Sequence, residues 1–228
     1  MSFGVLFLND SNRVQIDENT PVLSLIQKGT ATATTAVMGS PTTRAYTLTL
    51  TGRTAPLLAI GVEKPSQGEK GFQIVEVVRN GGSWTYTIMI WHQYGTDFGF
   101  RWYLFDLPYG TPLIGYGLAV WDAQGRLVFN SNHAPMRSVT AMAAGRSYAA
   151  VYYAPFILNE SWSWDTAEQR DRVTWSLYCE AVATYPGAGW ASGYVDGGES
   201  FSGPTIPWPN TQSGGGPLSP LFVEVTGL

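Results

Sequence analysis

The feature that most constrains the fold of this 228-residue chain is a repeat within its own sequence. One copy, FGVLFLNDSNRVQIDEN, begins at Phe3, and the other, YGLAVWDAQGRLVFNSN, begins at Tyr116, 113 residues later. Three positions are identical in the two copies, and several others keep their apolar character. The repeat predicts a tandem duplication, with one half over residues 1–114 and the other over residues 115–228. The alternative is that two short apolar segments resemble each other by chance.

Each copy has the pattern of a β-hairpin with a four-residue turn. Asn9 and Asp122 stand where the turn begins, and either side chain can hydrogen-bond the backbone two residues further on. Asn12 and Gly125 stand where it closes, and both tolerate the left-handed conformation needed there. We therefore expect the same hairpin twice. The expected equivalences are Asn9 with Asp122, Asn12 with Gly125 and Arg13 with Arg126.

The strands of these hairpins are apolar on both faces. In the first copy Phe3, Val5 and Phe7 alternate with Leu6 and Leu8, so both sides of the strand carry apolar side chains. A strand with one face in water should instead alternate between apolar and polar residues. Two interpretations stay open: the hairpin lies centrally in one core, or its second face contacts another subunit.

Short β-type segments separated by turns dominate the rest of the chain. Residues 45–51 alternate strictly, and Gly81-Gly82 is expected to join residues 72–79 to residues 84–91, because glycine readily adopts positive φ. This spacing is typical of sandwiches. The sequence predicts an all-β protein of two related β-sandwich-like halves. A helical turn is expected only over residues 165–172, where a capping pattern occurs.

Residues 186–220 differ from the rest, because they hold nine glycines and six prolines. We expect a long Gly/Pro-rich C-terminal loop there, with too little regular pattern for a strand pair. The segment also holds Trp190, Tyr194, Phe201 and Trp208. If these side chains were all exposed to solvent, they would form an apolar patch of a size that soluble monomers seldom have. We therefore expect the loop to order against a neighbouring subunit or another protein.

The second copy of the repeat resembles a known family. The run YGLAVWDAQGRLVFNS over residues 116–131 is similar to the start of tail proteins of tailed bacteriophages, which are small β proteins of the tail tip or tail fibre region. Residues 3–17 resemble a more diverged copy, with Asn12 where the pattern has glycine. The resemblance covers about 15 residues in each of the two places. It implies a structural protein of the virion, assembled in the host cytoplasm, with other tail proteins and further copies of itself as partners.

Composition excludes several other classes. The chain has 13 basic and 17 acidic residues, whereas a nucleic-acid-binding protein normally carries a basic face. No apolar run is long enough for a membrane span, and we expect no signal peptide at the N-terminus. Cys179 is the single cysteine, which excludes an internal disulfide framework, and with two histidines it cannot build a zinc site without carboxylates. We expect no metal and no cofactor.

Signatures of catalysis are few. The sequence contains no phosphate-binding loop, no dinucleotide fingerprint and no esterase-type nucleophile motif. Two carboxylate pairs stand near aromatic residues, Glu160 with Asp165 and Asp196 with Glu199, and a glycosidase needs such a pair. Acids that cap turns on exposed loops have the same pattern. We therefore expect a protein that is not an enzyme.

Aromatic residues in polar or Gly/Pro-rich segments are the candidate contact residues. Their rings can stack on sugars, and aromatic enrichment with few charges is also typical of the centre of an interface. Two functions stay open: a structural subunit of a phage tail that acts in tail assembly and host attachment, or a carbohydrate-binding, receptor-binding β-sandwich module without catalysis. A host-surface glycan is thus a further candidate partner. The candidate residues are Trp162, Trp164, Trp190, Tyr194, Phe201 and Trp208.

Overall fold

The structure, a computed structural model, describes residues 7–8, 14–16, 21–37, 41–51, 53–54, 56–109, 116–152, 157–165, 170–186, 190–201 and 220–228. For residues 7–8, 14–16, 157–165, 170–180 and 190–201 it describes the backbone alone. All regular elements in these ranges are strands, which confirms the predicted all-β class. The helical turn expected over residues 165–172 is wrong where the chain is described: Asp165 ends one strand and Arg170 begins the next.

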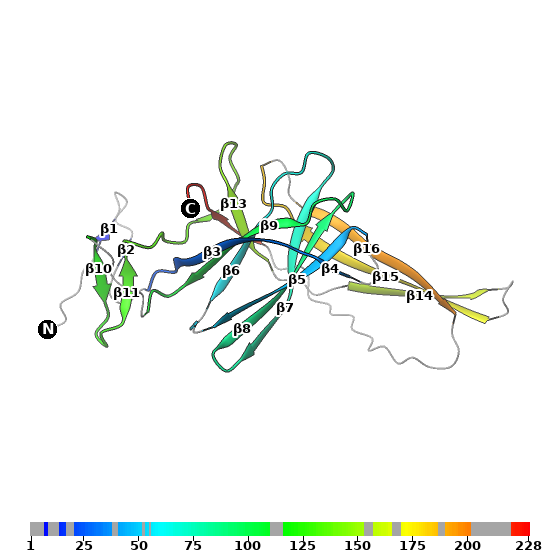
Figure 1. Cartoon of the computed structure of the whole chain (residues 1–228), viewed down its shortest axis with the longest axis horizontal. Coiled ribbons are helices and arrows are strands. Elements are labelled where there is room, and N and C mark those ends of the chain that lie inside the picture. The colour runs from blue at the N-terminus through cyan, green and yellow to red at the C-terminus, as the bar shows by residue number, and fades with distance from the viewer. Residues whose placement is uncertain are drawn as a thin grey trace.

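Two large antiparallel sheets form the body of the protein (Figure 1). The six-stranded sheet has the order β12 (Ser138–Val139), β17 (Leu221–Glu224), β13 (Tyr148–Val151), β6 (Leu57–Gly61), β9 (Gly99–Asp106) and β3 (Ser24–Thr32). The other has the order β14 (Ile157–Asp165), β15 (Arg170–Val182), β7 (Lys70–Asn80), β8 (Ser83–His92), β5 (Thr43–Thr51) and β4 (Thr35–Ala36), and β16 (Trp190–Phe201) pairs with β15.

The two sheets pack face to face around one main core. The predicted alternation of residues 45–51 is confirmed in β5, where Tyr46, Leu48 and Leu50 face this core and the threonines between them are exposed. Gly81 has φ +59° and joins β7 to β8, as expected. The side chains at the centre of the core are Leu58, Ile60 and Leu104 from one sheet and Phe72, Ile74 and Ile88 from the other.

Both sheets contain strands from both repeats. In the six-stranded sheet, β3, β6 and β9 come from residues 1–114, and β12, β13 and β17 come from residues 115–228. One pair of residues joins the two sets in each sheet: Ile60 with Ala150, and Phe72 with Val182. The two halves therefore build one sandwich together, and the boundary near residue 114 does not separate two sheets.

In the six-stranded sheet, the strand order is symmetric about its junction. Outward from the central β6–β13 pair, the six-stranded sheet runs β6, β9, β3 on one side and β13, β17, β12 on the other. Along the chain, each set begins with its outer strand, continues with the central strand and ends with the strand that lies between these two. In the second sheet, the central β7–β15 pair is flanked by β8 and β16, but the symmetry ends there, because β5 pairs with β8 whereas β14 pairs with β15. A duplicated unit gives this order when its two copies pair about an approximate two-fold axis.

Candidate functional site

The repeated segment forms two hairpins that stand apart from the large sheets. They are β1 (Phe7–Leu8) with β2 (Val14–Ile16), and β10 (Ala119–Trp121) with β11 (Leu127–Asn130). Each is a two-stranded sheet of its own, and both lie at the left end of the molecule in Figure 1.

The two hairpins have the same register. In the first, Phe7 pairs with Ile16 and Leu8 with Val14, with a register shift between these pairs. In the second, the pairs are Val120 with Phe129 and Trp121 with Leu127, and the shift occurs at the same place. Moving each residue of the first set by 113 positions gives the second set, so the predicted repetition of the hairpin is confirmed in its pairing. Asn9, Asn12 and Arg13 lie outside the described residues.

The second turn is held by the carboxylate of Asp122. Its Oδ1 accepts hydrogen bonds from the backbone amides of Gln124 at 2.9 Å and Arg126 at 2.8 Å, and its Oδ2 lies 2.6 Å from Nε of Arg126. Desolvation at the turn opposes ionisation, but these hydrogen bonds outweigh it and hold the pKa of Asp122 below its usual value. Gly125 has φ +74°, the left-handed conformation expected from the sequence.

The second hairpin carries both buried and exposed apolar side chains. Val120, Leu127 and Val128 are buried, whereas the side chains of Leu118 and Trp121 are 41 % and 48 % exposed and Tyr116 is fully exposed. We call the three exposed residues Tyr116, Leu118 and Trp121 together the hairpin face. The interpretation that the hairpin lies centrally in the core is wrong for the second hairpin, because it forms a separate sheet and none of its residues belongs to a core cluster. Contact of its exposed residues with another subunit stays a prediction.

Five of the six aromatic candidates lie in β14 and β16, two strands that extend to the right, away from the hairpins, in Figure 1. Trp162 and Trp164 are in β14, and Trp190, Tyr194 and Phe201 are in β16. Only their backbone is described, so partner or glycan contact stays a prediction for them. The same holds for the carboxylates Glu160, Asp165, Asp196 and Glu199 and for Cys179, while Trp208 lies outside the described residues.

The expected loop over residues 186–220 is wrong for residues 190–201. This segment pairs with β15 along its whole length, from Trp190 opposite Val182 to Phe201 opposite Arg172. Its glycines argued against a strand, but the ladder to a long neighbouring strand satisfies its backbone groups. Val195 falls between the paired Tyr194 and Asp196, where the register shifts. A bulge there accommodates the irregular sequence.

A pocket with a cavity of about 440 Å³ opens beside the edge strand β3. None of its charged residues was singled out from the sequence. The one available signal is Lys70, which directly precedes the apolar run of β7, because a lysine on a buried strand requires a partner. The cavity, which we call the polar pocket, is lined by Thr30, Ala31, Thr32, Glu63, Lys70, Asp97, Gly99, Phe100 and Arg101.

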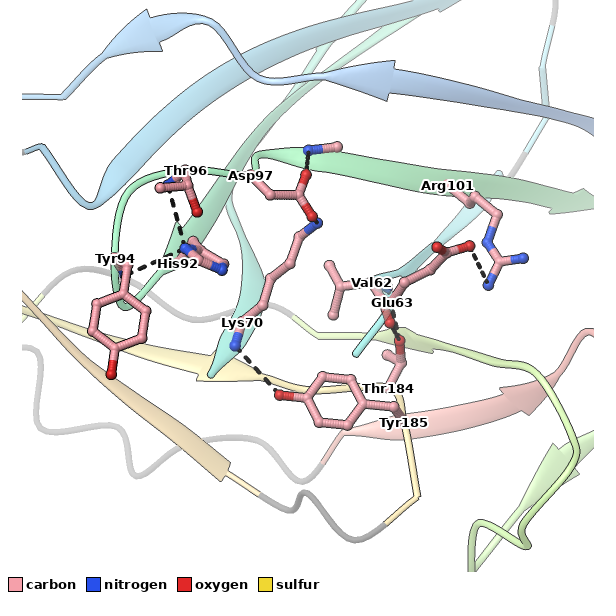
Figure 2. A network of polar contacts seen from close by, with 11 residues as sticks. Val62, Glu63, Lys70, His92, Tyr94, Thr96, Asp97, Arg101, Thr184 and Tyr185 are labelled. Atoms are coloured by element: carbon pink, nitrogen blue, oxygen red, sulfur yellow. Dashed lines mark hydrogen bonds and ion pairs between the residues drawn. The ribbon is translucent and has the colours of Figure 1, made fainter. Parts of the chain in front are cut away.

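The first ion pair of the polar pocket joins Lys70 to Asp97 (Figure 2). The Lys70 side chain is 2 % exposed, and its Nζ lies 2.6 Å from Oδ2 of Asp97. The other carboxylate oxygen accepts a hydrogen bond from the Gly99 amide at 2.9 Å. Burial alone would raise the pKa of Asp97, but Lys70 and the Gly99 amide outweigh it and lower this pKa. The hydroxyl of Tyr185, from the second half, accepts a hydrogen bond from the Lys70 amide at 3.3 Å.

His92 lies opposite Lys70 in the β7–β8 ladder and is buried. Its Nδ1 accepts hydrogen bonds from the backbone amides of Tyr94 at 3.3 Å and Thr96 at 3.4 Å. Burial lowers the pKa of His92; the charge of Asp97 opposes this and that of Lys70 adds to it. A neutral ring with a free Nδ1 lone pair is the form that can accept both bonds.

The second ion pair joins Arg101 of β9 to Glu63. Nη2 of Arg101 lies 3.5 Å from Oε1 of Glu63, whose side chain is 72 % exposed. Nε of Arg101 is buried and has no hydrogen-bond acceptor among the described residues. Beside this pair, the Thr184 hydroxyl accepts a hydrogen bond from the Val62 amide at 2.8 Å and donates one to the Val62 carbonyl at 2.9 Å. The pocket thus holds two cations and two carboxylates in pairs.

The described residues contain no group of three histidines, cysteines or carboxylates that could hold a metal ion. Within the same ranges, no helix is long and apolar enough to cross a membrane. Comparisons of the chain with family models, with curated proteins and with solved structures found no match.

Proposed function

We propose that this protein is a structural subunit of a tailed-phage virion, at the tail tip or in the tail fibre region, where it acts in tail assembly and host attachment. The observation that carries the proposal is the hairpin that resembles the start of phage tail proteins. It occurs twice with one register, stands apart from the sandwich, and exposes the hairpin face in its second copy. The expected partners are further copies of this chain and other tail proteins.

The hairpin face has the physical properties of a docking surface. Exposed apolar area disfavours the free state by about 25 cal/mol per Å², so covering Leu118 and Trp121 would stabilise an assembly. Tryptophan and tyrosine are enriched at the energetic centres of interfaces. The turn that directly follows Trp121 is already held by Asp122, so the backbone of the hairpin has little conformational entropy to lose on docking.

The direct test uses virions from the host that carries the gene. We expect mass spectrometry to detect the chain in virions purified on a density gradient. Immunogold labelling with an antibody against the chain should mark the tail. Intact tails that lack the chain, in a host that expresses it, would contradict the proposal.

A variant tests the role of the hairpin face. Trp121→Ser should reduce incorporation into tails at least ten-fold while circular dichroism and thermal stability stay unchanged, because Trp121 lies outside the core clusters. Val78→Ser, a change at an exposed apolar residue of β7, is the matched control and should incorporate normally. Normal incorporation of Trp121→Ser would exclude this face as the docking surface.

A further inference from the structure

We propose that the polar pocket is a binding site for a neutral sugar, one or two residues in size. The proposal stands on the geometry of the pocket and does not depend on the proposed role in a virion. It differs from glycan stacking on the aromatic candidates, which lie in β14 and β16 and do not line this pocket.

The size and lining of the pocket suit a polyhydroxylated ligand. A cavity of about 440 Å³ falls in the range of small-molecule sites. Sugar hydroxyls both donate and accept hydrogen bonds, so they match a wall that offers both kinds of group. Asp97 and Glu63 supply acceptors, Arg101 supplies donors, and the hydroxyls of Thr30 and Thr32 supply either.

Asp97 is an acceptor held in advance of binding. Lys70 fixes one of its oxygens and the Gly99 amide fixes the other, while the side chain is still 52 % exposed. Each carboxylate oxygen has two lone pairs, so each can accept a further hydrogen bond from a ligand. Hydrogen bonds to an ionised acceptor are stronger than those between neutral groups, and a fixed acceptor loses little entropy when it makes them.

The charge balance of the pocket selects a neutral ligand. Lys70 is paired with Asp97, and Arg101 with Glu63. An anion would face both carboxylates, and a cation would face both basic side chains, so either would have to displace a partner. A hydroxyl oxygen can instead approach the guanidinium of Arg101, whose side chain is 33 % exposed, and leave both ion pairs in place.

A titration followed by ¹H–¹⁵N correlation spectra tests the proposal. The probes are methyl α-D-glucopyranoside, methyl β-D-galactopyranoside and N-acetylglucosamine, each added to about 50 mM, because a site with a few hydrogen bonds binds in the millimolar range. At least one probe should give saturable shifts at the amides of Thr32, Gly99 and Arg101. Sodium phosphate and sodium acetate, the anionic comparisons, should give no saturable shifts there.

Variants connect such shifts to the pocket. Removing Asp97 would leave Lys70 buried without its partner, so the informative changes are Glu63→Gln and Thr32→Val, at residues that are at least partly exposed. Each should weaken the sugar three-fold to about ten-fold, the loss expected for one hydrogen bond. Glu76→Gln removes the same charge from an exposed site on β7 and should bind as the unchanged protein does.

Three results would overturn the proposal. They are no saturable shift with any of the three sugars, saturable shifts confined to β14 and β16, and saturation of the pocket amides by phosphate or acetate. The last result would identify an anion site instead.

Discussion

The Thr184 hydroxyl links the two halves, and replacing it gives a prediction whose size follows from the structure. Thr184→Val keeps the shape of the side chain but removes both hydrogen bonds to Val62, at 2.8 and 2.9 Å. Val62 is buried, so its amide and carbonyl would be left without these partners. A buried group that loses its partner costs about 1–3 kcal/mol, so we expect the free energy of unfolding to fall by about 2–4 kcal/mol.

Urea unfolding at neutral pH, with calorimetry, measures this loss. For a chain of this size each kcal/mol lowers Tm by about 2–4 °C, so Tm should fall by about 5–15 °C. Thr184→Ser is the control, because it keeps the hydroxyl and removes one buried methyl group, at a cost of about 1 kcal/mol. If the valine variant is as stable as the serine variant, the two hydrogen bonds do not hold the halves together and the reasoning fails.

Three further predictions concern the polar pocket and the hairpin. Because the pKa of Asp97 is lowered in the folded state, its contribution to stability is present above its ordinary value of 3.8 and is lost as pH falls through the folded value. Urea titrations should therefore show the stability difference between the unchanged protein and Asp97→Asn shrinking below pH 3.8. The pKa of His92 is also lowered in the folded state, from 6.5, so the unfolded chain takes up a proton first as the pH falls. The free energy of unfolding should therefore decrease as pH drops below 6.5. A His92→Gln variant whose free energy of unfolding depends on pH as steeply as that of the unchanged protein would contradict this. Gly125→Val should destabilise the second hairpin by about 1–3 kcal/mol, because a β-branched residue resists φ +74°, whereas Gly125→Asn should cost less; amide exchange of residues 119–130 compares the two.

The sequence predicted those features that depend on nearby residues. The turn at Asp122 and Gly125 was predictable because its hydrogen bonds span two to four residues. The alternation of β5 was predictable for the same reason, since side chains change face at each residue. In both places, local chemistry and the tertiary structure favour the same conformation.

The remaining features depend on contacts between distant residues, for which the sequence holds no local signal. Nothing near Ile60 indicates that it pairs with Ala150, so the sharing of both sheets was not predictable from periodicity. The polar pocket likewise combines Lys70 and Asp97 with Tyr185 of the second half. The glycines of residues 190–201 favoured a loop in the interpretation of the sequence. Pairing with β15, which that interpretation did not include, makes this segment the strand β16.

The interlocked halves have a consequence for synthesis on the ribosome. Chains emerge from the N-terminus, so β6 and β7 are made well before their partners β13 and β15. Until residues 148–182 have emerged, the nascent protein carries two open sheet edges beside a core that lacks Ala150, Tyr152 and Val182. Such edges pair readily with other chains. We therefore expect slow translation of the second half to favour aggregation with neighbouring nascent chains.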